Sequence, residues 1–278
     1  MREITVRKKE NIQEIGLITA VLLINFIKDL ILFLIMTAQI YLFSKEAKLW
    51  SNRLTKLLNE EPKFKGKWKV WVVEFPGNSE MVNAFSLGIG SKHVFITKPL
   101  VKMLTDREIM AVLLHEAAHS VGLHMIQQTA GHYGFLTICV QLFMKYGFGV
   151  YMALPSFLSY IMIVVFFGLA PQILTARTLG RWHERVGDSY AVKHGYGKEL
   201  ISALRKMTKH MMKECTTKFC KKMMDILHAI DAHPPLKQRV KEIMGEIAKI
   251  KAGAKVKASQ ITAIVKKAFK SMMPKEEN

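Results

Sequence analysis

Two long apolar segments constrain this chain more than any other feature of its sequence. The first covers residues 16–43 and contains only two charged residues, Lys28 and Asp29. As an α-helix at 1.5 Å per residue, it would reach about 42 Å, which is enough to cross a bilayer with some tilt. It is too long for the apolar core of a signal peptide and has no small-residue cleavage site, so we expect a retained anchor. A buried helix of a soluble protein is the alternative.

The second apolar segment covers residues 133–174, and Lys145 is its only formally charged residue. The sequence Ala-Leu-Pro-Ser at 153–156 divides it near the middle. Two short spans joined by a tight turn fit this length, so we expect a transmembrane hairpin with helices at 133–153 and 156–175. Both ends of such a hairpin return to the same side of the membrane. A re-entrant pair of helices stays open as the alternative.

The overall composition excludes a disordered chain. Half of the 278 residues are hydrophobic, with 15 Phe and only 8 Pro, which is enough apolar material for a folded core. The formal net charge is +19, and residues 176–278 hold 23 basic against 10 acidic side chains. Such a basic region fits either nucleic acid or the anionic face of a membrane. The three cysteines, Cys139, Cys215 and Cys220, are too few for a disulfide framework, which suits a reducing compartment.

The region between the two apolar segments has the character of a small α+β domain. Strands are expected at 67–73, 82–87 and 93–97, where β-branched and aromatic residues lie between glycines. Thr105 and Glu108 have the spacing of a capping box, which predicts a helix from residue 106 through residue 119. After the hairpin we expect helices at 177–194, 198–213, 217–230, 235–251 and 258–272. The last is amphipathic and basic, and it either lies on a membrane surface or docks on the domain.

A metal-binding motif lies inside the capped helix. Residues 115–119 read His-Glu-Ala-Ala-His, and the i,i+4 spacing places both imidazoles on one helix face, where they can bind one Zn²⁺. Glu116 lies one residue along and can reach water at the metal. A hydrolytic zinc site needs a third protein ligand, and Glu184 is our candidate. Asp188, one turn later, is expected to accept an N–H from a ligating imidazole, that of His115. Without the histidine motif, these two carboxylates would indicate only a solvated helix face.

An ordered series of motifs resembles the HtpX-type membrane zinc proteases, a family that also includes the CaaX prenyl protease type 1. The resemblance covers about residues 65–250. Its members are Asn83-Ala84-Phe85, Gly88 and Gly90, the strand at 93–97, Thr105 to Glu108, His115 to His119 with His124, Arg181 to Asp188, and His233-Pro234-Pro235-Leu236 with Arg239. The resemblance implies a gluzincin fold in which His115, His119 and Glu184 bind zinc and Glu116 is the catalytic base.

The resemblance also assigns roles around the metal. It implies that the strand containing Asn83, Ala84 and Phe85 holds the substrate backbone, and that His233 stabilises the developing oxyanion. A turn cap for Asn83 and a helix-entry position for His233 are the alternatives. HtpX-type enzymes usually show two spans where the first apolar segment of this chain shows one, so their topology is not carried over.

The remaining histidines carry no motif. His93, His132, His183, His194, His210 and His228 are expected to be surface or packed residues. At 100° per residue, His124 would lie about 140° away from the ligand face of His119, which excludes it as a fourth ligand on this helix.

The sequence therefore predicts a membrane-embedded zinc endopeptidase of HtpX type that cleaves membrane or misfolded proteins and holds one Zn²⁺ per chain. The expected fold class is α+β, with a mostly helical gluzincin domain, a small β-sheet and transmembrane helices. Residues 1–44 form the N-terminal membrane anchor, 45–132 and 176–278 the protease domain, and 133–175 the inserted hairpin.

Basic residues set the expected orientation. They are denser at 45–69 than before the first span, which predicts an active site facing the cytosol from the inner membrane of a cell. The expected partners are protein or peptide substrates and the lipid bilayer, without nucleic acid. The alternative is a non-catalytic basic protein that binds membranes or nucleic acid on a degenerate protease scaffold.

Overall fold

The computed structural model describes residues 16, 19–20, 23–24, 26–28, 31, 34, 48–62, 67–74, 80–87, 90–214, 217 and 233–251. The described positions within the predicted N-terminal span are helical, but most of that span lies outside the described residues. The predicted helix at 258–272 lies outside them as well, as do Cys215, Cys220 and all of the predicted helix at 217–230 except Thr217.

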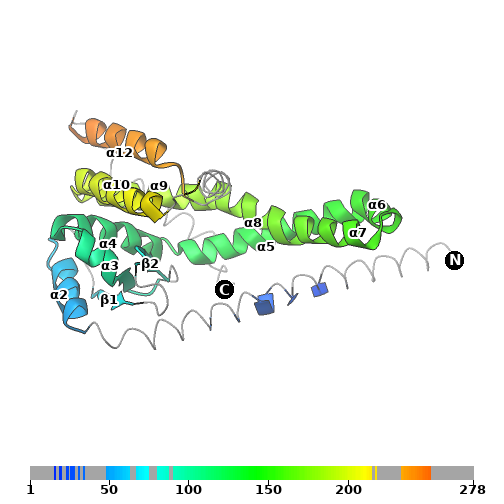
Figure 1. Ribbon diagram of the computed structural model, residues 1–278, viewed down its shortest axis with the longest axis horizontal. Helices are drawn as coiled ribbons and strands as arrows, with labels where there is room; N and C mark the ends of the chain where they lie inside the picture. The colour runs from blue at the N-terminus through cyan, green and yellow to red at the C-terminus, as the bar shows by residue number, and fades with distance from the viewer. Residues whose placement is uncertain are drawn as a thin grey trace, which may run out of the picture.

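The chain forms a helical body with a small sheet, from which a long helical hairpin projects (Figure 1). The elements of the body are α2 (Lys48–Asn59), β1 (Lys69–Val73), β2 (Ala84–Ser86), β3 (His93–Thr97), α3 (Lys98–Met103), α4 (Asp106–Val121), α10 (Gly197–Glu214) and α12 (Leu236–Lys251). The hairpin consists of α5 (His124–Leu142), η2 (Phe143–Gly147), α6 (Phe148–Ala153), α7 (Ser156–Ile163), η3 (Val164–Leu169), α8 (Ala170–Thr175) and η4 (Ala176–Gly180), where η marks π-helical segments. Its last helix, α9 (Arg181–Lys193), returns to the body. This architecture confirms the predicted α+β class.

The sheet has the order β1-β3-β2, with β1 parallel and β2 antiparallel to β3. All three predicted strands form, although the first begins two residues later and the second is shorter than the sequence predicts. Within the described part of the chain, β2 is an edge strand. The Thr97 N–H donates to the Asn83 carbonyl at 2.9 Å, and peptide groups alternate between the two edges of a strand. The backbone groups of Ala84 and Ser86 therefore point to the open edge.

Helix α4 is the central element of the body, and its start follows directly from local sequence. Thr105 Oγ1 accepts a hydrogen bond from the Glu108 N–H at 3.3 Å, while the Thr105 N–H donates to Glu108 Oε2 at 2.8 Å, which confirms the capping box. Apolar residues on several faces of α4, among them Ile109, Leu113 and Leu114, are fully buried between the sheet and helices α9 and α10. This packing places the histidine motif opposite α9.

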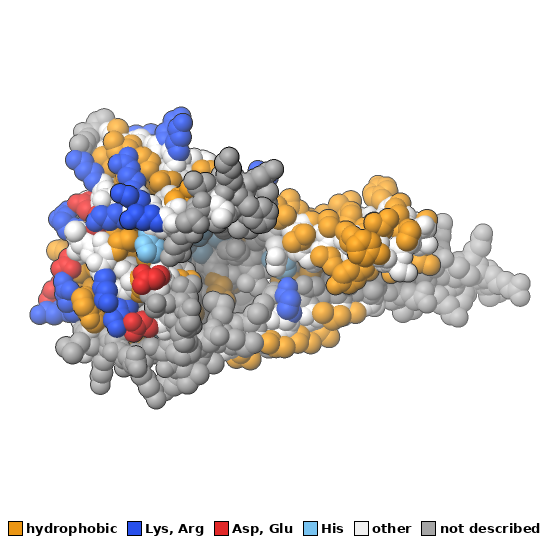
Figure 2. Space-filling model, in the orientation of Figure 1, with side chains coloured by type: hydrophobic (Ala, Val, Ile, Leu, Met, Phe, Trp, Pro, Cys, Tyr) orange, Lys and Arg blue, Asp and Glu red, His pale blue; other side chains and the backbone are white. Residues whose placement is uncertain are grey.

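The hairpin is longer than the sequence predicts. Two continuous helical stretches, His124–Ala153 and Ser156–Lys193, are long and apolar enough to cross a membrane. Their apolar side chains face outward: Phe157 is 72% exposed and Met152 68% exposed. Figure 2 shows apolar side chains gathered over the hairpin and charged side chains over the body. An exposed apolar surface of this extent is typical of contact with lipid or another protein.

The predicted helix boundary between 175 and 177 was wrong. The chain stays helical through η4 into α9, because the change from apolar to charged residues there introduces no residue that ends a helix. Instead, α9 ends at Lys193, and Gly195 soon after it adopts a φ of 92° in the left-handed region, which is typical of a glycine that follows a helix end. The hairpin and the candidate ligand Glu184 therefore share one continuous helix.

Candidate metal centre and active site

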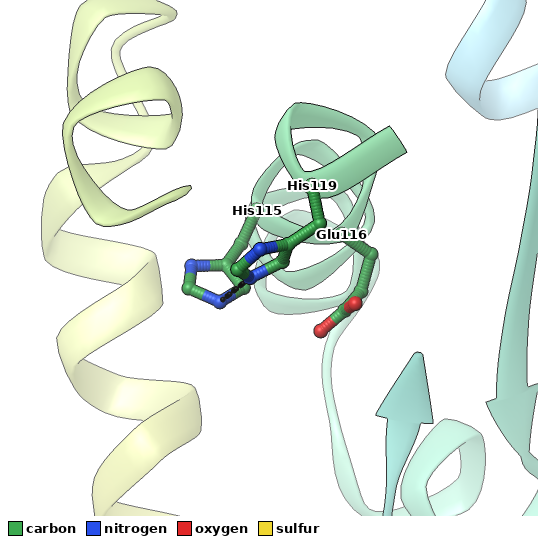
Figure 3. A group of neighbouring side chains, drawn as sticks. All are labelled: His115, Glu116 and His119. Carbon is green, nitrogen blue, oxygen red and sulfur yellow. Dashed lines mark hydrogen bonds between the residues drawn. The ribbon is translucent and has the colours of Figure 1, made fainter. Parts of the chain in front are cut away.

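The two imidazoles of the motif lie side by side on α4 (Figure 3). His115 Nε2 and His119 Nε2 are 3.0 Å apart, and the rings meet edge to face. His115 is buried and His119 is half-buried. One nitrogen of each ring is thus aimed at a common point, as the i,i+4 spacing requires.

Glu184 on α9 completes a triangle with these two nitrogens. Its Oε2 lies 3.5 Å from His115 Nε2, and its Oε1 lies 3.4 Å from His119 Nε2. Two ligands of a tetrahedral zinc ion, each about 2.0–2.1 Å from the metal, are about 3.3–3.4 Å apart. The edges of the observed triangle are close to this separation, so the donor set fits a zinc ion.

Glu184 is itself buried, and its environment is rich in cationic groups. His233 Nδ1 lies 2.8 Å and Arg239 Nη1 3.1 Å from Glu184 Oε2. They are ion-pair contacts, and among the described residues this buried oxygen has no hydrogen-bond partner. A buried carboxylate oxygen in this condition is suited to a metal ion.

Asp188 lies behind His115, on the side away from the triangle. Its Oδ1 is 3.1 Å from His115 Nδ1, a close polar contact that does not have hydrogen-bond geometry. Arg239 from α12 donates two hydrogen bonds to the same carboxylate, of 2.9 and 2.6 Å. Burial alone would lower the pKa of His115, but the charges of Glu184 and Asp188 outweigh it and raise this pKa to about 10. The site therefore favours positive charge at His115, whether a proton or a metal supplies it.

Glu116 points in a different direction from the two imidazoles. Figure 3 shows its side chain leaving α4 on the side of the strands, away from α9. One carboxylate oxygen still lies within 4.8 Å of a nitrogen of each histidine. Burial raises the pKa of Glu116, although the neighbouring histidines act in the opposite direction. Glu116 is therefore close to the centre without completing the triangle.

A cavity of about 1520 Å³ opens over the centre. Asn83, Ala84 and Phe85 line it together with Glu116 and His233, so all the predicted substrate-binding and catalytic residues face one space. All three residues of β2 line this cavity. Residues near the base of the hairpin also line the cavity: Gln128, Thr129, His132, Gln172, Thr175 and Arg177.

Three features of the site escaped the sequence interpretation. Arg239 was part of a motif without a role, yet it is 7% exposed and holds both carboxylates of α9. Gly187 leaves room for a ring, because a Cβ there would lie 2.7 Å from His115 Nδ1. A glycine in mid-helix between Glu184 and Asp188 was the available signal for this close approach.

The third feature is a group of histidines beside the motif. His124 Nδ1 lies 2.7 Å from His119 Nδ1, and the His124 ring stacks on that of His183 at 4.0 Å between centroids. Spacing along a helix gave no signal for these contacts.

The chain matches a protein family and is similar to eight chains of solved structures. The model of Peptidase family M48 matches residues 45–247, which include every candidate site residue. The crystal structure of S. mikatae Ste24p is similar to this chain at 19% identity with a TM-score of 0.46. That similarity covers 80% of this chain and 66% of the Ste24p chain, so this chain spans slightly less than two thirds of that protein. The curated proteins contain no match.

Proposed function

The chain belongs to peptidase family M48, and on this premise we propose that it is a membrane-embedded, zinc-dependent endopeptidase of HtpX type. One observation carries the proposal: two imidazole nitrogens and a carboxylate form a triangle with edges of 3.0, 3.4 and 3.5 Å. The three residues come from a capped helix and from the helix packed against it, so the packing of the body fixes their arrangement.

In this proposal His115, His119 and Glu184 hold the zinc ion, and Asp188 fixes the tautomer of His115. A bound zinc ion supplies Lewis acidity, which activates water and polarises a carbonyl group near neutral pH. Glu116 takes a proton from the attacking water and later delivers it to the leaving amine. Its position beside the triangle, within 4.8 Å of both histidines, suits this role.

The cavity would bind the substrate as an extended strand. The backbone groups of Ala84 and Ser86 point to the open edge of β2, where a peptide can add a further strand by main-chain hydrogen bonds. Asn83 and Phe85 line the same space and would contact its side chains. His233, whose side chain is more than half exposed beside Glu184, would donate a hydrogen bond to the oxyanion in this proposal.

The membrane context follows from the exposed apolar hairpin. We assign residues 133–175 to the membrane, 1–44 to a further anchor, and 45–132 with 176–278 to the protease domain at the membrane surface. The substrates would be membrane or misfolded proteins, cleaved on the cytosolic side of the inner membrane. A tag at residue 278 should resist added protease in sealed spheroplasts and be digested after lysis. Digestion from outside would contradict the orientation.

The proposed chemistry is tested by Glu116→Gln in detergent-purified protein. This variant should keep one equivalent of zinc and lose degradation of casein, because the amide cannot take up the proton. Glu60→Gln is the matched control, since Glu60 is exposed beside Lys56 and does not line the cavity, so its substitution should leave activity unchanged. A chelator should abolish wild-type activity and added zinc should restore it. Full activity of Glu116→Gln, or of the zinc-free protein, would refute the proposal.

A further inference from the structure

His119 has a second polar contact on the side away from the candidate metal. Its Nε2 faces His115 Nε2 and Glu184, whereas its Nδ1 lies 2.7 Å from His124 Nδ1. Between two neutral rings, one of these Nδ1 atoms must donate a hydrogen and the other accept it. A metal at Nε2 requires the lone pair of that atom, so the hydrogen of His119 resides on Nδ1. His124 Nδ1 is then the acceptor, and the hydrogen of His124 resides on Nε2.

The chain holds the ring of His124 in this place from several directions. Leu123 before it adopts a φ of 54°, a left-handed conformation that is rare for a residue other than glycine, asparagine or aspartate. At Gly122 a Cβ would collide with His124 Nε2, so glycine leaves the space that this ring occupies. His183 covers one face of the ring at 4.0 Å and 10°, and His183 Nε2 is in turn 2.9 Å from Gln127 Oε1.

We propose that His124 is a positioning residue for the metal centre, which accepts the Nδ1 hydrogen of His119 and fixes the tautomer and direction of that ring. This inference rests on the proposed zinc site. It gives each ligating imidazole an outer partner: His115 has the carboxylate of Asp188 at 3.1 Å, and His119 has the imidazole of His124 at 2.7 Å. Outer partners of this kind keep a ligand nitrogen aimed at its metal.

The contact between His124 and His119 links the candidate metal centre to the hairpin. His124 begins the helical stretch His124–Ala153, and His183 belongs to the stretch Ser156–Lys193. The acceptor and the ring that supports it therefore come from the two legs of the hairpin, at the level where they enter the body. Separation of the legs would remove the His183 ring from the face of His124, so the packing of the hairpin supports the outer partner of His119.

The test compares two variants of the full chain in detergent. Asparagine places its Oδ1 near the position of histidine Nδ1 and can accept the same hydrogen, whereas phenylalanine keeps a ring without an acceptor. We expect His124→Phe to weaken zinc binding by about 10- to 100-fold and His124→Asn to stay within about threefold of wild type. The zinc dissociation constant is measured by competition with a fluorescent chelator, and circular dichroism of the zinc-free proteins reports folding.

His194→Phe is the control, because His194 lies at the end of α9 and bonds the Tyr190 carbonyl. Wild-type affinity in His124→Phe overturns the inference, and so does an equal loss in both His124 variants, which would indicate packing alone. If the wild-type protein binds no zinc, the proposed function fails first. The two failures are therefore distinguishable without an activity assay.

Discussion

Replacing Gly187 with alanine tests whether α9 must leave room for His115. In the structure a Cβ at this position would lie 2.7 Å from His115 Nδ1 and Cε1, whereas ordinary contacts begin at 3.4 Å. The ring must therefore move by 3.4 − 2.7 = 0.7 Å, or the helix must move away from it. Metal–ligand distances tolerate only about 0.2 Å, and the Nδ1 atom of the same ring also contacts Asp188.

The expected loss in zinc affinity is about 10- to 100-fold, which corresponds to about 1.4–2.8 kcal/mol. The stability of the zinc-free protein should increase slightly or stay nearly unchanged. Alanine gains about 0.8–1 kcal/mol over glycine in a helix interior, and this gain offsets the strain of the displaced ring. Gly187→Ala should therefore weaken the metal site without destabilising the fold.

Two measurements on detergent-purified protein separate these effects: the zinc dissociation constant by chelator competition, and the unfolding midpoint of the zinc-free protein. Gly245→Ala is the matched control, since Gly245 lies within α12 and a Cβ there would meet nothing within 4 Å. The control should gain stability and keep its zinc affinity. An unchanged zinc dissociation constant in Gly187→Ala would show that zinc binding does not depend on the close approach of α9 to His115.

Three further predictions concern other parts of the site and the body. Arg239→Met should destabilise the zinc-free protein by about 3–5 kcal/mol, because it removes the guanidinium that contacts both buried carboxylates, and Arg239→Lys should recover part of this loss in urea unfolding. Burial raises the pKa of Glu108, but its bonds to Lys206, Ser202 and Thr105 outweigh this and lower it from 4.5 to about 2. Glu108 should therefore contribute up to about 3 kcal/mol above pH 4.5, and this is lost as the pH falls towards 2. Glu108→Gln should weaken the pH dependence of the unfolding midpoint over that range. An unchanged pH dependence would contradict the assignment. Ala84→Pro should remove one outward N–H from β2 and raise the KM for an extended peptide about 2- to 10-fold, with kcat less affected.

The parts that were predictable from the sequence are those set by neighbours along the chain. The capping box of Thr105 and Glu108 fixed the start of α4, and the i,i+4 spacing placed both histidines on one face. The helical spacing of Glu184 and Asp188 likewise identified the two carboxylates as candidates. Their distances to the histidines depend on how α9 packs against α4, which no local pattern specifies.

Contacts between distant segments were out of reach for the same reason. Arg239 meets Asp188 across 51 residues of chain, and both residues alone would indicate ordinary surface charges. Their burial becomes understandable only when α12 covers α9. The order of the three strands is a similar case, because their sequences indicate strands without indicating which of them forms the open edge.

The turn between α4 and α5 is where the helical interpretation of the sequence failed, and the failure has a physical cause. A continuous helix would carry His124 about 140° away from His119. Instead, α4 ends at Val121, and Leu123 adopts a φ of 54°, which costs a residue with a Cβ about 1–2 kcal/mol. This one change sends α5 out into the hairpin and returns the His124 ring to His119. A straight helix could do neither. The contacts of the His124 ring with His119 and His183 therefore offset the strain at Leu123.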